Sequence, residues 1–295
     1  MPAQPAAPSV PRRQVARILS KLHRESGLYI KDVAEQVNLH HVTVTKMLKG
    51  QPCKLKPIYI DKLCDIYHAT PETRMTLKAI AAEAESARGW WYDFNDVVSP
   101  DKLDVYITLE GTATAVSIYQ NARIPGLLQT EGYARGLLRT SPDLTPEEVE
   151  RHVQVRMRRQ AVLTESKPRL DAILDESVIR RLLSDSQLAA GQLHRIAEVS
   201  RLPNVSVRLV PFDTGIYRGT EEGHFIILDF AGTAGLEPEP SVAFVEGGAG
   251  GGNLYLQKPE QVARYRRSWV DIERSTLSAA KTRAYLSKIA KELPR

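Results

Sequence analysis

The sequence predicts an α+β protein in which an N-terminal domain of five helices precedes a mixed α+β domain with a mostly antiparallel sheet. Two observations support this prediction. Residues 12–86 repeat apolar side chains at helical spacing in short stretches, whereas the later residues combine long amphipathic stretches with short β-type runs. With 295 residues, of which 42% are hydrophobic, the chain is long enough for two packed cores.

Five short helices account for residues 12–86. The first is expected at residues 12–26, because Val15, Ile18 and Leu19 share one face and Gly27 is typical of the position after a helix. Pro57 suits the first position of the fourth helix. The remaining helices are expected at residues 30–37, 41–49, 57–67 and 71–86.

The stretch GLYIKDVAEQVNLHHVTVTKMLKG, residues 27–50, predicts two short helices joined by a tight turn. The small side chain of Ala34 stands where the two helices would cross. Asn38 stands at the turn, where few residues other than glycine tolerate a left-handed backbone. This spacing is typical of a helix-turn-helix, whose second helix can enter the major groove of DNA.

The second domain is expected at residues 101–295, after a linker at residues 87–100 in which Trp90 and Trp91 pack between domains rather than form a ligand cage. Residues 116–124 are compatible with a strand or a helix end. Further strands are expected at residues 170–174, 205–210, 224–229, 242–245 and 254–256, and helices at 127–139, 146–164, 176–183, 188–200, 261–277 and 279–293.

Charge is distributed unevenly along the chain. The net charge is +5, but residues 1–80 carry 13 Lys or Arg against 6 Asp or Glu, a local net charge of +7. Residues 81–295 carry 27 against 29, a local net charge of −2. The positive balance therefore coincides with the helix-turn-helix, as expected for a module that binds phosphates. The alternative is that these lysines only solvate helix faces.

Several classes of protein are disfavoured. No apolar run approaches the ~20 residues of a membrane span, and residues 1–11 predict a flexible tail without the pattern of a secretory signal. Cys53 and Cys64 lack the spacing of a zinc site and are expected as reduced thiols in the cytoplasm, where the protein would associate with the nucleoid. No cofactor is expected, and GGAGGGN at residues 247–253 predicts a hairpin connection rather than a phosphate loop.

Candidate DNA contacts fall into two groups. Side chains on the exposed face of the second motif helix are expected to meet base edges, since methyl groups suit thymine while Lys and His donate to guanine. Basic residues around that helix are expected to touch phosphates. The first group is His41, Val42, Thr43, Thr45 and Lys46; the second is Lys49, Lys54, Lys56, Lys31, Arg12 and Arg13.

At these residues the chain resembles the Xre/Cro family of helix-turn-helix regulators, in the segments GLYIKDVA and VNLHHVTVTKMLKG. The resemblance implies a DNA-binding domain. Two departures stand out: His40 replaces the usual Ser or Thr cap, and Ile30 replaces a Gln that often touches DNA. The operator therefore does not carry over, and His40 and His41 are also compatible with ordinary surface histidines.

A second resemblance lies further along the chain, in IPGLLQTEGYAR, RMRRQ, ILDESVIRRLL, QLHRI, PNVSVRLVPFDTG, HFIILDF and SVAFVEG. In this order, over about residues 90–290, these motifs are similar to the C-terminal domain of actinobacterial antitoxin-like regulators of the WhiJ type. The resemblance implies a transcription regulator that acts with a small acidic partner protein. It implies no catalytic activity.

Polar residues in this domain form a candidate ligand or partner site. An Arg/Glu set of this kind can be a structural ion pair, a clamp for a ligand carboxylate or part of an active site, and the sequence leaves all three open. The set comprises Glu110, Gln129, Tyr133, Arg156, Arg159, Gln160 and Glu176.

Three functions compete. The leading expectation is a dimeric, sequence-specific DNA-binding transcriptional regulator whose second domain responds to a protein partner or a small-molecule effector. The second is an antitoxin-like protein whose main role is to sequester a small partner. An enzyme, such as a hydrolase, ranks last, because no nucleophile–base arrangement or catalytic motif is present. No catalytic residue is therefore assigned.

Overall fold

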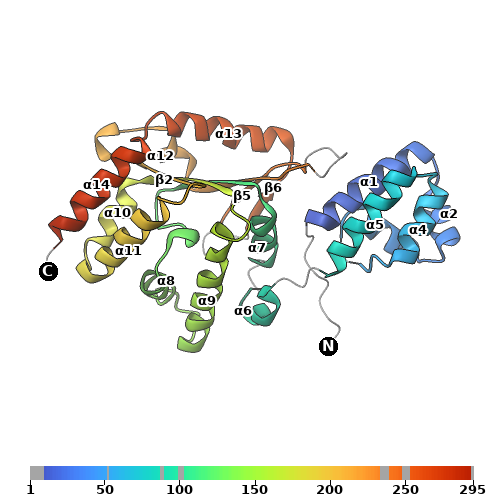
Figure 1. The fold of residues 1–295 in the computed structure, drawn as a ribbon, viewed down its shortest axis with the longest axis horizontal. Helices are drawn as coiled ribbons and strands as arrows, with labels where there is room; N and C mark the ends of the chain where they lie inside the picture. Colours follow the sequence, from blue (N-terminus) through green and yellow to red (C-terminus); the bar gives the residue numbers. More distant parts are fainter. Residues whose placement is uncertain are drawn as a thin grey trace. The chain divides into compact units, whose positions relative to one another are not determined.

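The computed structural model describes residues 10–51, 53–86, 90–98, 103–232, 239–247 and 253–293. The chain divides into two compact units, one helical and one built on a sheet that has six strands within these residues (Figure 1). The α+β class expected from the sequence is confirmed.

Five helices make up most of the first unit, which also includes residues 90–95 and 103–109, and they lie close to the expected positions. The first begins at Val10 rather than Arg12, because Val10 and Pro11 are buried and extend its apolar face. The rest of the expected tail lies outside the described residues. The helices are α1 (Val10–Ser26), α2 (Ile30–Val37), α3 (His41–Leu48), α4 (Pro57–Ile66) and α5 (Pro71–Ser86).

The segment that the sequence predicts as a linker contains short helices where it is described. These are η1 (Trp90–Phe94) and α6 (Asn95–Val98), while residues 87–89 and 99–100 lie outside the described residues. Trp90 packs edge-to-face on Phe94, with ring centroids 6.2 Å apart. A helix that the sequence reading missed, α7 (Leu103–Thr112), follows. It has five consecutive buried residues, 106–110, and therefore lacks a single apolar stripe.

The sheet of the second unit has the strand order β3-β2-β1-β4-β5-β6. Strands β1, β2 and β3 are parallel neighbours, whereas the β1–β4, β4–β5 and β5–β6 pairs are antiparallel. The sheet is therefore mixed, with antiparallel pairs in the majority. The strands are β1 (Ala115–Gln120), β2 (Arg169–Asp175), β3 (Val205–Val210), β4 (Phe225–Asp229), β5 (Val242–Val245) and β6 (Leu254–Leu256).

Helices connect the parallel strands, as a parallel crossover requires. Two of them, α8 (Glu131–Leu138) and α9 (Pro146–Arg159), lie between β1 and β2, and another two, α10 (Glu176–Leu182) and α11 (Ser186–Val199), lie between β2 and β3. The helix expected at residues 127–139 is broken, with η2 (Gly126–Leu128) before α8, because Thr130 caps the new helix by accepting from the Tyr133 N–H. The helix expected at 146–164 ends as η3 (Gln160–Leu163).

Two faces of the sheet are covered by different helices. Tyr119, Ile173 and Phe225 project from one face into a core that includes Val262 and Ile272 of α13. In Figure 1, α13 lies over this face and α8 and α9 lie on the opposite side. The remaining helices are α12 (Arg218–Glu222), α13 (Pro259–Glu273) and α14 (Ala279–Glu292), with the short η4 (Phe212–Thr214) after β3.

Candidate functional site

The turn between α2 and α3 has the conformation that the sequence predicts. Asn38 adopts φ 61° and ψ 49°, in the left-handed region. The Leu39 N–H donates to the Ala34 carbonyl at 2.9 Å, which closes the end of α2. His40 then caps α3, because its Nδ1 accepts from the Val42 N–H at 3.3 Å. The histidine thus fills the place of a Ser or Thr cap.

Buried side chains and contacts with α1 hold α3 in place within the first unit. Val44 and Met47 are buried, and the Ser20 hydroxyl donates to the Leu48 carbonyl at 2.7 Å. Gly50 follows at φ +66°, and a Cβ there would lie 3.3 Å from the Cβ of Ala16. A larger residue at this position would therefore strain the turn and separate α3 from α1.

The outward face of α3 carries the predicted base-contacting side chains. His41, Val42 and Lys46 are exposed, with Val42 45% exposed, and Lys49 is exposed just after the helix. Thr43 and Thr45 are half-buried. The Thr45 hydroxyl donates to the His41 carbonyl at 2.9 Å, so its hydrogen bond is directed to the helix itself.

The predicted phosphate-contacting residues divide into exposed and buried ones. Lys31, Lys54 and Lys56 are exposed. Arg13 is half-buried, and Arg12 is only 7% exposed. Arg12 Nη2 donates to Glu85 at 2.6 Å, and Nη1 donates to the Cys53 carbonyl. Arg12 therefore holds the segment after α3 to α5, and we remove it from the phosphate-contacting set.

In the second unit, side chains predicted as a ligand or partner site surround the backbone of residues 124–130. Gln129 Nε2 donates to the Ile124 carbonyl at 2.7 Å, and the Ile124 N–H donates to the Tyr133 hydroxyl at 3.1 Å. Gln160 Nε2 donates to the carbonyls of Gly126 at 3.0 Å and Gln129 at 2.7 Å. These side chains therefore fix the loop that follows β1.

Arginines from α9 complete this cluster. Arg159 forms a two-pronged ion pair with Glu110 at 2.9 and 2.8 Å, and their side chains are 10% and 2% exposed. Arg156 Nη1 donates to Gln129 Oε1 at 2.9 Å. Burial, with the positive charges of Arg159 and Arg123, lowers the pKa of Arg156 to about 10. Six of the seven predicted residues thus lie in one cluster.

The seventh predicted residue, Glu176, lies elsewhere. Its carboxylate accepts from Arg180 Nε at 2.7 Å, from the Phe212 N–H at 2.9 Å and from the Tyr285 hydroxyl. Burial raises the pKa of this carboxyl, but the three hydrogen bonds outweigh burial and lower it. Glu176 therefore joins α10 to the end of β3 and to α14, and we assign it a structural role.

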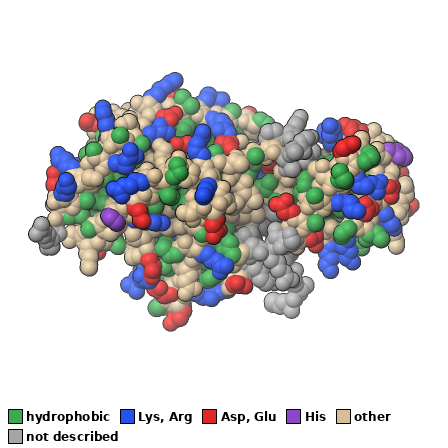
Figure 2. Space-filling model, in the orientation of Figure 1, with side chains coloured by type: hydrophobic (Ala, Val, Ile, Leu, Met, Phe, Trp, Pro, Cys, Tyr) green, Lys and Arg blue, Asp and Glu red, His purple; other side chains and the backbone are tan. Residues whose placement is uncertain are grey.

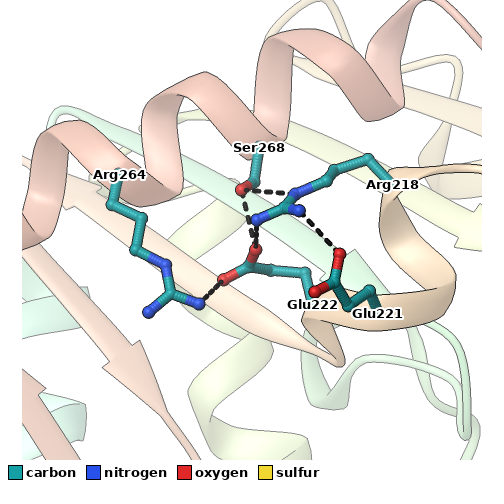
Figure 3. Close-up of polar contacts among 5 residues, drawn as sticks. All are labelled: Arg218, Glu221, Glu222, Arg264 and Ser268. Atoms are coloured by element: carbon teal, nitrogen blue, oxygen red, sulfur yellow. Dashed lines mark hydrogen bonds and ion pairs between the residues drawn. The ribbon is translucent and has the colours of Figure 1, made fainter.

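A second buried carboxylate is also structural. The Glu222 side chain is 1% exposed and accepts from Arg218 at 2.6 Å, Arg264 at 3.0 Å and Ser268 at 2.9 Å, as Figure 3 shows. Glu221 pairs with the other side of Arg218 at 2.8 Å. Both carboxylate oxygens of Glu222 are satisfied, so this cluster ties α12 to α13.

The polar side chains around the backbone of residues 124–130 are here called the loop cluster. Sequence reasoning missed four polar residues in or next to it. Gln192 of α11 is fully buried and binds the same loop. Its Nε2 donates to the Leu128 carbonyl at 2.7 Å, and its Oε1 accepts from the Thr130 N–H at 2.8 Å. Gln120, Arg123 and His224 stand at the ends of β1 and β4. The available signal was a polar residue at the boundary of an apolar strand, in AVSIYQ and HFIILD.

Surface charge in the second unit is dispersed. On the visible face in Figure 2, Lys and Arg side chains alternate with Asp and Glu, in keeping with the net charge of −2 over residues 81–295. Within the described ranges, no three His, Cys, Asp or Glu side chains are grouped so that they could hold a metal ion. None of the helices described is long and apolar enough to cross a membrane.

Comparison with known proteins finds a family match over most of the second unit. The family described as a domain of unknown function (DUF5753) matches residues 103–288. The five helices α1–α5 precede the matched residues. No curated protein and no solved structure matches the chain.

Proposed function

The chain belongs to the DUF5753 family, and because an all-helical unit precedes that domain, we propose that the protein is a sequence-specific DNA-binding transcriptional regulator. One observation carries the proposal. The α2–α3 pair combines a left-handed Asn38, a His40 cap and an exposed polar face on α3. These are the features that let the second helix of a helix-turn-helix enter a major groove.

In this proposal α3 reads the operator. His41 and Lys46 offer donors to base acceptors, and the Val42 side chain offers methyl groups for thymine. Lys31, Lys49, Lys54 and Lys56 surround the helix and contact phosphates, which supply affinity but carry no sequence information. The net charge of +7 over residues 1–80 supports this division of roles. Such a regulator would act on the nucleoid in the cytoplasm.

The second unit supplies the regulatory input. Its similarity to the C-terminal domain of WhiJ-type antitoxin-like regulators supports a role in dimerisation, in effector binding and in docking a small acidic partner protein. The protein would then bind a palindromic operator as a homodimer.

A second function, sequestration of a partner protein, is favoured by one surface feature. Phe212 is 57% exposed and Ile216 is 95% exposed, both in the connection after β3. Apolar side chains this exposed are available to contact a partner protein. Co-purification with a small acidic neighbour-encoded protein, lost on replacement of both residues by Ser, would favour sequestration. Both functions can coexist in one chain.

The test is a fluorescence-anisotropy titration of the full chain with DNA from its own promoter, at low salt and at several salt concentrations. Lys54→Ala and Lys56→Ala should weaken binding to all sequences and reduce the salt slope by about one per lost contact. Lys46→Ala should instead change the preference among operator variants.

Lys78 provides a matched control, because it is exposed on α5 and pairs with Asp61 at 2.9 Å. Lys78→Ala removes one positive charge but should leave DNA affinity within about twofold, because Lys78 lies on α5, outside the α2–α3 motif, and is already paired with Asp61. Absence of binding at low salt, or an equal effect of Lys46→Ala and Lys78→Ala, would rule out α3 as the reading helix.

A further inference from the structure

The loop cluster continues onto the edge of the sheet. Tyr119 is paired with Phe225, and Ile226 with Phe244, in antiparallel register. Extending the first register by one position places Gln120 beside His224, and extending the second by two positions places His224 beside Glu246. Three polar residues from β1 and the ends of β4 and β5 therefore form a row, here called the polar row. It lies at the carboxyl end of β1, next to β4, the first strand of the sheet that runs antiparallel to β1.

Among the residues that the structure describes, two atoms of the polar row are buried and have no hydrogen-bond partner. These are Oε1 of Gln120, in a residue that is 4% exposed, and Nε2 of His224. Burying a polar atom without a partner is costly, so a native structure that contains such an atom requires an explanation. Glu222 in Figure 3 shows the contrast, because both of its carboxylate oxygens have a partner.

Both unpartnered atoms are acceptors. The other ring nitrogen of His224 forms a hydrogen bond with the backbone of Glu246. This bond raises the His224 pKa, so the ring nitrogen is the donor. Burial and the nearby Arg123 outweigh this bond and lower that pKa, so the imidazole is neutral near pH 7. A neutral imidazole that donates from one nitrogen accepts at the other. Gln120 Oε1 and His224 Nε2 therefore both await a donor.

Positive charge exceeds negative charge next to the polar row. Arg123, Arg156 and Arg159 face the carboxylates of Glu110 and Glu246, three positive charges against two negative ones, which leaves a net charge of +1. Arg159 forms an ion pair with Glu110, and Arg123 forms one with Glu246. Within the described residues, Arg156 makes one hydrogen bond, to the neutral Gln129. Arg156 is thus the arginine of this group without a carboxylate partner.

We propose that the polar row and Arg156 form a binding site for a small monoanionic hydroxycarboxylate, in which Arg156 binds the carboxylate and the single O–H of the ligand donates a hydrogen bond shared by Gln120 Oε1 and His224 Nε2. A single negative charge balances the local excess, and a guanidinium fork matches a carboxylate. The donor is a hydroxyl, because an ammonium group would meet three arginines. The side chains of Arg123 and Glu246 are 32% and 42% exposed, so the group borders solvent at this ion pair.

A role of this ligand as the effector rests on the proposed function, but binding itself does not. The test therefore uses the full chain without DNA, by calorimetry and by thermal unfolding. The probes are glycolate and L-lactate, with acetate lacking the hydroxyl, glycerol lacking the charge, L-serine adding an ammonium and inorganic phosphate adding charge. Glycolate or lactate should bind and raise the unfolding temperature, and each of the other probes should bind at least about tenfold more weakly.

Variants locate the site. Arg156→Gln should weaken glycolate or lactate binding by on the order of ten- to a hundredfold, as expected for loss of a charge-assisted contact. Arg158→Gln, at an exposed position of the same helix, should leave binding unchanged. If Arg156→Gln does not fold, His224→Ala should remove most of the preference for hydroxycarboxylates over acetate, because it deletes one of the two acceptors for the hydroxyl and leaves Arg156 in place.

Three results would overturn the inference: no heat and no thermal shift with either hydroxycarboxylate at millimolar concentration, equal binding of acetate, or equal losses in Arg156→Gln and Arg158→Gln. Since DNA is absent from these measurements, failure here leaves the DNA titration intact. Failure of the DNA titration likewise leaves ligand binding to be judged by its own result.

Discussion

At the scale of single residues, two adjacent glutamates of α12 differ sharply in burial. The Glu222 side chain is 1% exposed and the Glu221 side chain is 80% exposed, yet both bind Arg218. Glu222→Gln should lower the free energy of unfolding of the second unit by about 2–3 kcal/mol. This loss is below the ~3–5 kcal/mol of fully buried pairs, because both arginines retain contact with water.

Urea unfolding followed by circular dichroism measures this difference. Glu221→Gln is the control, and it should change the free energy of unfolding by less than about 0.5 kcal/mol, as exposed ion pairs usually do. Equal losses in the two variants would mean that the contacts to Arg264 and Ser268 do not stabilise the α12–α13 junction.

Glu176 predicts a pH dependence of stability. Its carboxyl pKa is lowered in the folded chain, since the hydrogen bonds from Tyr285, Phe212 and Arg180 outweigh burial. A lowered pKa means that the ionised carboxylate stabilises the fold above the unfolded pKa of about 4.3, and that this stabilisation is lost as the pH falls through the folded pKa. The unfolding temperature of wild type should exceed that of Glu176→Gln at pH 7.

This difference in unfolding temperature should shrink as the pH falls below the unfolded pKa and through the folded pKa, because the protonated wild-type carboxyl resembles the amide. Glu147, at an exposed position of α9, supplies the comparison: Glu147→Gln should change the unfolding temperature much less than Glu176→Gln at pH 7. A Glu176→Gln difference that stays constant from pH 7 to pH 3 would show that the ionised form makes no contribution.

Residue types alone indicated much of the loop cluster. Glu110, Gln129, Tyr133, Arg156, Arg159 and Gln160 were identified as polar residues within structured segments, and the structure brings them together. Their roles in fixing the loop depend on which backbone groups they reach, which a sequence does not contain. Gln120 and His224 become neighbours only through pairing of β1 with β4, more than 100 positions apart along the chain.

At the scale of elements, the α2–α3 turn depends on the backbone of Asn38, which has φ 61°. Asn38→Gly should be close to neutral, because glycine adopts this conformation without strain. Asn38→Ala should destabilise the turn by about 1–2 kcal/mol, since a left-handed backbone costs other L-residues that much.

Hydrogen exchange of the α3 amides in the full chain detects this local effect. The amides of α3 should exchange about tenfold faster in Asn38→Ala than in Asn38→Gly. Amides of the β1–β2 pair supply an internal reference that should not change. Similar exchange of α3 in both variants would mean that the left-handed turn does not limit the stability of the motif.

Most helices and strands could be predicted because their apolar periodicity is strong, as in α1, α9 and β3. The pairing of the strands could not. Runs such as Val205–Val210 read the same in parallel and antiparallel sheets, and only the helical crossovers reveal the parallel β1-β2-β3 set. The helix α7 was missed since its buried residues 106–110 are consecutive, and α12 was missed because it has only 5 residues.

At the scale of the whole molecule, charge and fold separate two tasks. Most of the helical unit lies in residues 1–80, which carry a net charge of +7, and all six described strands lie in residues 81–295, which carry −2. The first unit has one reading helix, α3, of 8 residues. One such helix contacts too few base pairs for high specificity, so the proposed regulator requires two copies on one operator.

A homodimer predicts a strict dependence on the spacing of the half-sites. Two α3 helices on one face of DNA read half-sites about 10 base pairs, or 34 Å, apart. Once footprinting has defined the operator, inserting about 5 base pairs at its centre should turn the half-sites to opposite faces and reduce affinity by on the order of a hundredfold or more. The control insertion of about 10 base pairs restores the facing and should lose less. Anisotropy titrations, with sedimentation to give the stoichiometry, measure both. Equal affinity for all three spacings would mean that the protein binds each half-site as a monomer, and the second unit would then have no part in operator recognition.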